Sequence, residues 1–259
     1  MKFSKILTPA ILLLILGIVA ADFGVNLLEN KKVSSKLSKF KKTKRKTDGH
    51  FSVGSTNKEW ANKILKGGYI IYIRHTQRDK SWEGGGIYDL LESDIHNNGI
   101  NGTRFAENDY FSGPVCLTKK GKVQAQAIGE HFQKLKFPVG KVISSPICRA
   151  RQTAEIIFGK YDQIDRTLVH SGVHSEKADT RYQNLLDFFR NVPVEPDKNT
   201  VITAHGNVII PGLFENPNKQ NLKIEQGGMI VLSKNKGEIK VEHAFSQFSN
   251  FVRPFYERK

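Results

Sequence analysis

Three short apolar runs recur along the chain, and they constrain its fold more than any other feature. They read YIIYI at residues 69–73, KVIS at 141–144 and TVITA at 200–204. A continuous apolar run of this length, rich in β-branched residues, is typical of a strand that is buried on both faces. Helical patterns separate the runs. The sequence therefore predicts an α/β fold, a three-layer sandwich with a largely parallel central sheet flanked by helices.

The helical patterns between the runs have recognisable ends. Thr118 suits the N-cap of a helix over residues 119–137, and Gly67 and Gly68 suit the end of a helix over residues 58–66. In the longer helix, apolar side chains recur at helical spacing at Val123, Ala127, Ile128, Phe132 and Leu135. Further elements are expected as helices from about Pro146 to residue 159 and over residues 179–190, and as a closing strand pair at residues 229–232 and 238–241.

The segment over residues 81–114 interrupts this regular order. It contains many glycines and asparagines and has no sustained period, so we expect an extended loop or a small inserted subdomain. The predicted organisation is a membrane anchor or signal segment over residues 1–28, a basic flexible linker over residues 29–52, and one catalytic domain over residues 53–259 that carries this insert.

The apolar stretch from Ile6 to Ala21 follows two lysines near the start of the sequence. It is long for the apolar part of a signal peptide and borderline for a membrane span. Val19-Ala20-Ala21 provides a cleavage site with small residues, whereas the residues that follow would extend an uncleaved helix to about 23 residues. Both interpretations take the chain to a membrane, and we favour the uncleaved anchor.

A basic run from Lys31 to Lys46 follows the apolar stretch. Residues 1–50 hold 11 basic and 3 acidic side chains, so they carry more than half of the chain's net charge of +15. Such a run next to a membrane span attracts anionic lipid head groups. A solvated tether without a partner and a cytoplasmic catalytic domain both stay open. No nucleic-acid partner is expected, because the chain has no recognisable nucleic-acid module.

Cys116 and Cys148 are the two cysteines of the chain. No CxxC or Cys/His cluster accompanies them, which argues against structural zinc and against a disulfide framework. One disulfide would be compatible with an oxidising compartment, but the expectation is two buried free thiols.

Cationic and imidazole side chains follow each of the three predicted strands. Because the carboxyl ends of parallel strands meet at one edge of a sheet, these groups are expected to converge there. Such a pocket suits a tetrahedral dianion, and arginine neutralises a phosphoryl group without a metal ion or other cofactor. A neutral imidazole can also act as the nucleophile. The residues concerned are Arg74, His75, Arg78, Arg149, Arg151 and His205.

Four sequence blocks carry a resemblance to a known family. Arg74-His75-Thr76 is similar to an RHG signature, residues 117–125 (LTKKGKVQA) to LTxxGxxQA, residues 144–154 (SSPICRARQTA) to SSPxxRAxQTA, and residues 204–207 (AHGN) to a second histidine motif. In this order they resemble the histidine phosphatase superfamily, also called phosphoglycerate-mutase-like, over about residues 68–245. The resemblance implies the phosphoglycerate-mutase-like version of the predicted fold.

The resemblance also implies roles for individual residues. It makes His75 the nucleophile that becomes phosphorylated, and Arg74, Arg149 and His205 the ligands of the phosphoryl oxygens. Arg78 corresponds to a further phosphate-binding arginine in the acid-phosphatase branch of the family.

Some neighbouring positions depart from the family or receive simpler interpretations. In the acid-phosphatase motif RHGxRxP, Thr76 stands in place of the Gly and Lys80 in place of the Pro, so the assignment of Arg78 is the least secure. Arg151 is interpreted as a solvated helix residue or one partner of an internal salt bridge. His170 is interpreted as a surface residue of its loop.

The general acid that must protonate the leaving oxygen is harder to place. The acid-phosphatase branch has an Asp directly after the second histidine, where this chain has Gly206. The mutase-like branch has a Glu in a segment that often reads ExxxGxxEG, and that pattern is missing. Glu176 lies in about the corresponding place and is the first candidate. Asp79 and Glu83 are the alternatives, and a substrate with a good leaving group would need no carboxylic acid.

The predicted function is a metal-independent phosphatase that hydrolyses phosphomonoesters through a phosphohistidine. Family members with an N-terminal membrane segment include enzymes thought to remove phosphate from lipopolysaccharide core sugars, so an envelope sugar or lipid phosphate is the expected substrate. This layout implies a protein anchored in or exported across a bacterial inner membrane, with the periplasmic side favoured. A phosphoglycerate mutase and a non-catalytic protein that binds a phosphorylated ligand are the alternatives.

Overall fold

The computed structural model describes residues 57–81, 107–108, 111–170, 177–209, 213–214 and 222–256. The predicted anchor and linker, and most of the predicted insert, lie outside these residues, so the domain boundaries remain predictions. Within the described ranges, no helix combines the length and the apolar character needed to cross a membrane.

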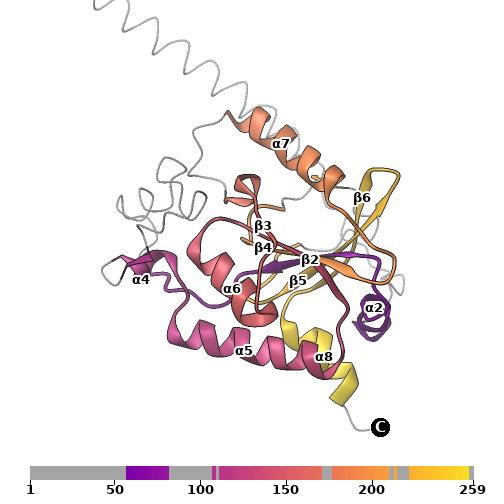
Figure 1. Ribbon diagram of the computed structural model, residues 1–259, viewed down its shortest axis with the longest axis horizontal. Helices are drawn as coiled ribbons and strands as arrows, with labels where there is room; N and C mark the ends of the chain where they lie inside the picture. Colours follow the sequence, from indigo (N-terminus) through magenta and orange to yellow (C-terminus); the bar gives the residue numbers. More distant parts are fainter. Residues whose placement is uncertain are drawn as a thin grey trace, which may run out of the picture. The chain divides into compact units, whose positions relative to one another are not determined.

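Six strands form the central sheet of the described part of the chain, in the order β3-β2-β4-β1-β5-β6 (Figure 1). The strands from β3 to β1 pair in parallel, whereas β5 and β6 are antiparallel additions at one side. This architecture confirms the predicted fold class. The strands are β1 (Ile70–Arg74), β2 (Val139–Ser144), β3 (Gln163–Ile164), β4 (Asn199–Ala204), β5 (Met229–Asn235) and β6 (Glu238–Phe245).

Helices cover the two faces of the sheet (Figure 1). Side chains of β1 alternate between the apolar clusters on these two faces. Ile71 and Ile73 belong to the apolar cluster that contains side chains of four helices, whereas Ile70 and Tyr72 belong to the cluster that contains α7. Successive strand residues point to opposite faces, so a continuous apolar run supplies both layers of the core. The four helices are α2 (Asn57–Ile64), α5 (Lys119–Lys134), α6 (Cys148–Phe158) and α8 (Phe248–Tyr256), and α7 spans Ala178–Asn191.

The predicted start of α5 is confirmed, and so is part of its predicted apolar stripe: Ile128, Phe132 and Leu135 pack on the core, whereas Val123 and Ala127 are exposed. The Thr118 side chain accepts a hydrogen bond from the backbone N–H of Gly121, as an N-cap should. The buried side of the helix contains Gly121, Ala125, Ile128, Gly129 and Phe132, while Val123 is 63% exposed. Close packing of α5 on α6 explains the difference, because a Cβ at Gly129 would lie 3.0 Å from the backbone oxygen of Ile157. Small residues therefore mark the contact side.

Four described elements were not predicted from the sequence. They are α4 (Ser112–Val115), β3, the 3-10 helix η3 (Arg166–Leu168) and α8. The first three have two to four residues each, which is too short for a periodic pattern to show. In α8, buried Phe251 packs among the aromatic rings of the cluster that covers one face of the sheet.

Candidate active site

His75 and His205 emerge side by side where two neighbouring strands end. Strands β1 and β4 pair in parallel with Arg74 opposite Ala204, so the residue after each strand reaches the same level of the sheet. The backbone N–H of His75 donates to the carbonyl of Ala204 at 2.9 Å, and the two imidazole rings lie 5.4 Å apart. The predicted convergence of these two histidines is therefore observed.

The hydrogen bond that His75 makes determines its tautomer. Its Nδ1 lies 2.8 Å from the carbonyl oxygen of Thr76. A carbonyl only accepts, so Nδ1 carries the proton and Nε2 keeps its lone pair. The side chain is 2% exposed, and burial, with the Arg149 charge second, holds the pKa of His75 well below its usual range. His75 is thus a neutral imidazole at neutral pH, as a nucleophile requires.

His205 is held in a different way. Its Nε2 lies 2.9 Å from the hydroxyl of Ser145, while its buried Nδ1 has no hydrogen-bond partner within the described residues. The Tyr72 hydroxyl donates to the His205 carbonyl at 2.6 Å and accepts from its N–H at 3.1 Å. Burial, followed by the charge of Arg149, keeps the pKa of His205 well below its usual range. A neutral ring whose Nδ1–H is available can donate to an anion.

Three arginines complete the cationic wall of a cavity of about 400 Å³. Arg149 lies in the first turn of α6 and is 2% exposed. Arg74 donates to the carbonyl of Ile224 at 2.8 Å, and Arg78, which is 8% exposed, donates to the carbonyl of Asp79 at 2.9 Å. The cavity is lined by Arg74, His75, Arg78, Arg149 and His205, together with His170, Gly206, Asn207, Lys223 and Ile224.

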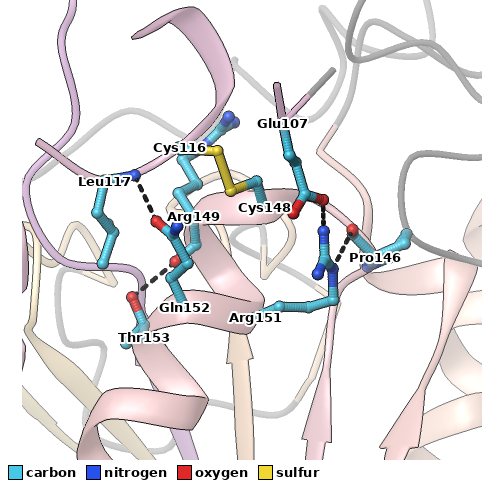
Figure 2. Close-up of a disulfide and its surroundings, with 9 residues drawn as sticks. All are labelled: Glu107, Cys116, Leu117, Pro146, Cys148, Arg149, Arg151, Gln152 and Thr153. Carbon is cyan, nitrogen blue, oxygen red and sulfur yellow. Dashed lines mark hydrogen bonds and ion pairs between the residues drawn. A yellow bond between two sulfur atoms is a disulfide. The ribbon is translucent and has the colours of Figure 1, made fainter. Parts of the chain in front are cut away.

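A disulfide between Cys116 and Cys148 lies beside this wall, so the expectation of two free thiols is wrong (Figure 2). The two Cα atoms are 4.9 Å apart although the cysteines are 32 residues apart in the chain. The Gln152 side chain also accepts from the N–H of Leu117 at 2.9 Å, next to the disulfide. The disulfide and this hydrogen bond therefore connect the start of the LTxxGxxQA block to the SSPxxRAxQTA block, and the disulfide lies directly before Arg149.

Arg151 does not line the cavity. Figure 2 shows Arg149 and Arg151 on opposite sides of Cys148, with Arg151 directed to Glu107. Arg151 is 1% exposed, forms an ion pair with Glu107 and donates from Nε to the Pro146 carbonyl at 2.8 Å. The interpretation as one partner of an internal salt bridge is confirmed, whereas the solvated alternative is wrong.

The predicted general acids fall into different situations. Glu176 and Glu83 lie outside the described residues. Asp79 accepts from the N–H and the hydroxyl of Ser81, and these hydrogen bonds lower the pKa of its carboxyl, which makes it a poor proton donor. At Gly206, a Cβ would lie 2.9 Å from Nε of Arg74, so the Asp of the acid-phosphatase branch would have to displace the Arg74 side chain.

His170 is a cavity residue that the sequence interpretation missed, although it is partly exposed as expected. It lines the cavity, and its ring lies 5.1 Å from the ring of His205. The signal available in the sequence was its place shortly after the short strand β3, next to β2 in the parallel part of the sheet. A two-residue strand has no readable period, so this signal could not be recognised.

Comparison with known proteins gives partial matches. Residues 112–169 match the family model of the histidine phosphatase superfamily, branch 1. The serine/threonine-protein phosphatase Pgam5 of mitochondria from Drosophila mojavensis is 32% identical over 123 residues, which cover 36% of this chain and 40% of the relative. The Pgam5 of Drosophila virilis is 30% identical over 122 residues, with the same coverage. The chain thus spans about two fifths of the length of these relatives.

Solved structures were matched as well. The protein histidine phosphatase SixA in complex with tungstate has a TM-score of 0.42 and 12% identity, with 68% of this chain and 96% of that chain covered. Phosphoglycerate mutase from Thermus thermophilus has a TM-score of 0.40 and 12% identity, with 68% and 98% covered. The family match includes two of the four motifs and the segment that contains Arg149, and it confirms that the chain resembles the histidine phosphatase superfamily.

Proposed function

We propose that the protein is a metal-independent phosphatase that hydrolyses phosphomonoesters through a phosphohistidine at His75. The observation that carries this proposal is the hydrogen bond from Nδ1 of His75 to the Thr76 carbonyl, which leaves the Nε2 lone pair available. This nitrogen belongs to a residue that lines a cavity with three arginines. A nucleophile and the positive charge that a phosphoryl group needs are therefore contributed by the same small cavity.

The other lining residues receive roles by their chemistry. Arg74 and Arg149 offer planar guanidinium groups, which suit two phosphoryl oxygens at once. His205 donates from Nδ1 to a third oxygen, because Ser145 engages its Nε2. Arg78, a further buried lining residue, adds a positive charge. These donors act on charge that spreads over the phosphoryl oxygens in the transition state, so no metal ion is required.

The substrate is proposed to be a phosphorylated sugar or lipid of the cell envelope. Two sequence features support this, the apolar stretch of residues 6–21 and the basic run of residues 31–46, which together suit a membrane anchor with a lipid-facing linker. The disulfide supports a placement outside the reducing cytosol, on the periplasmic side. Because the relatives are named serine/threonine-protein phosphatases, a substrate screen should compare phosphorylated sugars and lipids with phosphoproteins.

The first test is hydrolysis of p-nitrophenyl phosphate by the full chain in detergent, with EDTA present, next to His75→Ala. We expect activity that survives the chelator and is lost in the variant, and an alkaline quench should trap an acid-labile phosphoenzyme in the wild type alone. A folded wild type that is inactive but binds vanadate would instead identify a phospho-ligand binding protein. Activity that appears only after addition of a bisphosphoglycerate would identify a mutase.

A further inference from the structure

The proposed reaction needs a proton donor, and the described part of the cavity contains no carboxylate. Within the described residues, the lining side chains are arginines, histidines, a lysine and uncharged groups, without an Asp or a Glu. An alcohol leaves poorly as an alkoxide, so a side chain near the scissile bond must protonate the leaving oxygen. Imidazole is the lining group that can both give and take a proton near neutral pH.

His170 is the lining imidazole whose role is not yet assigned. His75 is the nucleophile, and His205 is buried and engaged through Nε2 by Ser145. His170 is partly exposed, and its ring lies 5.1 Å from the ring of His205. It therefore lies at the edge of the phosphate-binding groups, where the leaving part of a substrate would pass from the cavity to the solvent.

The backbone that leads to His170 is held by three packed elements. Arg181 of α7 donates to the carbonyl of Val169 at 3.0 Å, and the N–H of Val169 donates to the carbonyl of Arg166 in η3 at 3.1 Å. The Val169 side chain is 3% exposed and packs on Ile147, the residue that caps α6. His170 thus starts from a backbone position that is fixed relative to Arg149, as a proton donor must be.

Two described carboxylates near the site, Asp79 and Glu107, are engaged elsewhere. Asp79 accepts two hydrogen bonds from Ser81, which favour its ionised form. Glu107 forms an ion pair with Arg151, which does not line the cavity. Position 206 carries no side chain, and a Cβ there would lie 2.9 Å from Nε of Arg74.

We propose that His170 is the general acid and base of this phosphatase, in place of a carboxylic acid; the proposal rests on the function inferred above. In the first step, Nε2 of His75 bonds to phosphorus, the bond from phosphorus to the leaving oxygen breaks, and protonated His170 gives that oxygen its proton. In the second step, neutral His170 takes a proton from water while the water oxygen bonds to phosphorus. The phosphorus–nitrogen bond then breaks, and its electron pair returns to His75.

The test varies the leaving group of the substrate, because loss of a proton donor affects poor leaving groups most, whereas loss of a phosphate-binding residue affects all of them equally. kcat/KM, which reports the phosphorylation step, is measured for 2,4-dinitrophenyl, 4-nitrophenyl and phenyl phosphate with the wild type and His170→Asn. Dinitrophenolate leaves without a proton, whereas phenolate needs one. We expect His170→Asn to lose at least about 100-fold with phenyl phosphate and only a few-fold with the dinitrophenyl ester. His131→Asn, the same change on α5 beside α8 and outside the cavity lining, should leave all three rates unchanged.

Two outcomes would overturn the role of His170, and a third would overturn the function on which it rests. Equal losses with all three esters would make it a phosphate-binding residue. A loss that depends on the leaving group in Glu176→Gln, but not in His170→Asn, would assign the acid to the carboxylate. A wild type that hydrolyses none of the esters would overturn the proposed function itself. Titration of His170→Asn with vanadate, with an unchanged Kd expected, shows that the variant is folded and that its phosphate site is intact.

Discussion

The disulfide between Cys116 and Cys148 should stabilise the fold strongly while contributing little to catalysis. It closes a loop with a sequence separation of 32 residues. In the chain-entropy account, a cross-link over a loop of this size lowers the entropy of the unfolded chain enough to add about 4 kcal/mol to the free energy of unfolding. For a domain of this size, the corresponding loss on reduction is roughly 8 to 16 °C in Tm.

The activity of the reduced protein should behave differently from its stability. Arg149 follows the disulfide directly, but its turn of α6 keeps the hydrogen bonds from Thr153 to the Arg149 carbonyl at 2.7 Å and from Leu117 to Gln152 at 2.9 Å. Because the cross-link acts mainly on the unfolded chain, we expect kcat/KM at 25 °C to change only a few-fold.

Urea unfolding and p-nitrophenyl phosphate hydrolysis are measured for the oxidised protein and for the protein refolded in reductant. Cys116→Ala/Cys148→Ala serves as the control that no longer responds to reductant. Two results would refute the reasoning. One is a stability difference below about 1 kcal/mol between the two redox forms. The other is titration of two thiols in the unfolded protein without reductant.

Three further predictions concern single positions. Gly206→Ala should raise the Kd for vanadate about tenfold, because its Cβ would lie 2.9 Å from Nε of Arg74 and displace the guanidinium; unchanged titration would refute this contact. Thr153→Val should lower the free energy of unfolding by about 1–3 kcal/mol, because it leaves the buried N–H of Thr76 without its acceptor. Thr153→Ser keeps the hydroxyl, so urea unfolding of this variant should show most of the wild-type stability. Burial lowers the pKa of His243 from 6.5 to about 4, so the unfolded chain binds the proton more readily. The free energy of unfolding should therefore fall by about 2 kcal/mol as the pH drops from 6.5 to 4, and urea midpoints of His243→Gln over this range should fall less steeply.

The fold, and the convergence of the residues proposed to bind phosphate, could be predicted because their signals are local. Each apolar run shows its strand within five residues, and the carboxyl ends of parallel strands share one edge, which brings His75 and His205 together. The cap at Thr118 and the start of α6 near Ile147 could likewise be predicted from the residues next to them in the sequence. The proposed roles of His75, Arg74, Arg149 and His205 depend on these local signals and on the family resemblance.

Pairs of residues that are distant in the sequence were not predictable. Three contacts join segments that no common sequence pattern links. They are the disulfide, the ion pair of Arg151 with Glu107, and the approach of His170 to His205. The buried side of α5 depends likewise on how closely Gly129 approaches Ile157 in another helix.

The sequence by itself thus determined which elements form, in which order, and which cationic groups follow the strands. The tertiary structure alone decided that the two cysteines pair, that the ring of His170 lies beside that of His205, and that a side chain at position 206 would meet Arg74. The reason is physical: secondary structure follows from the repeat of neighbouring side chains, whereas these contacts depend on register and packing distances of about an ångström between elements.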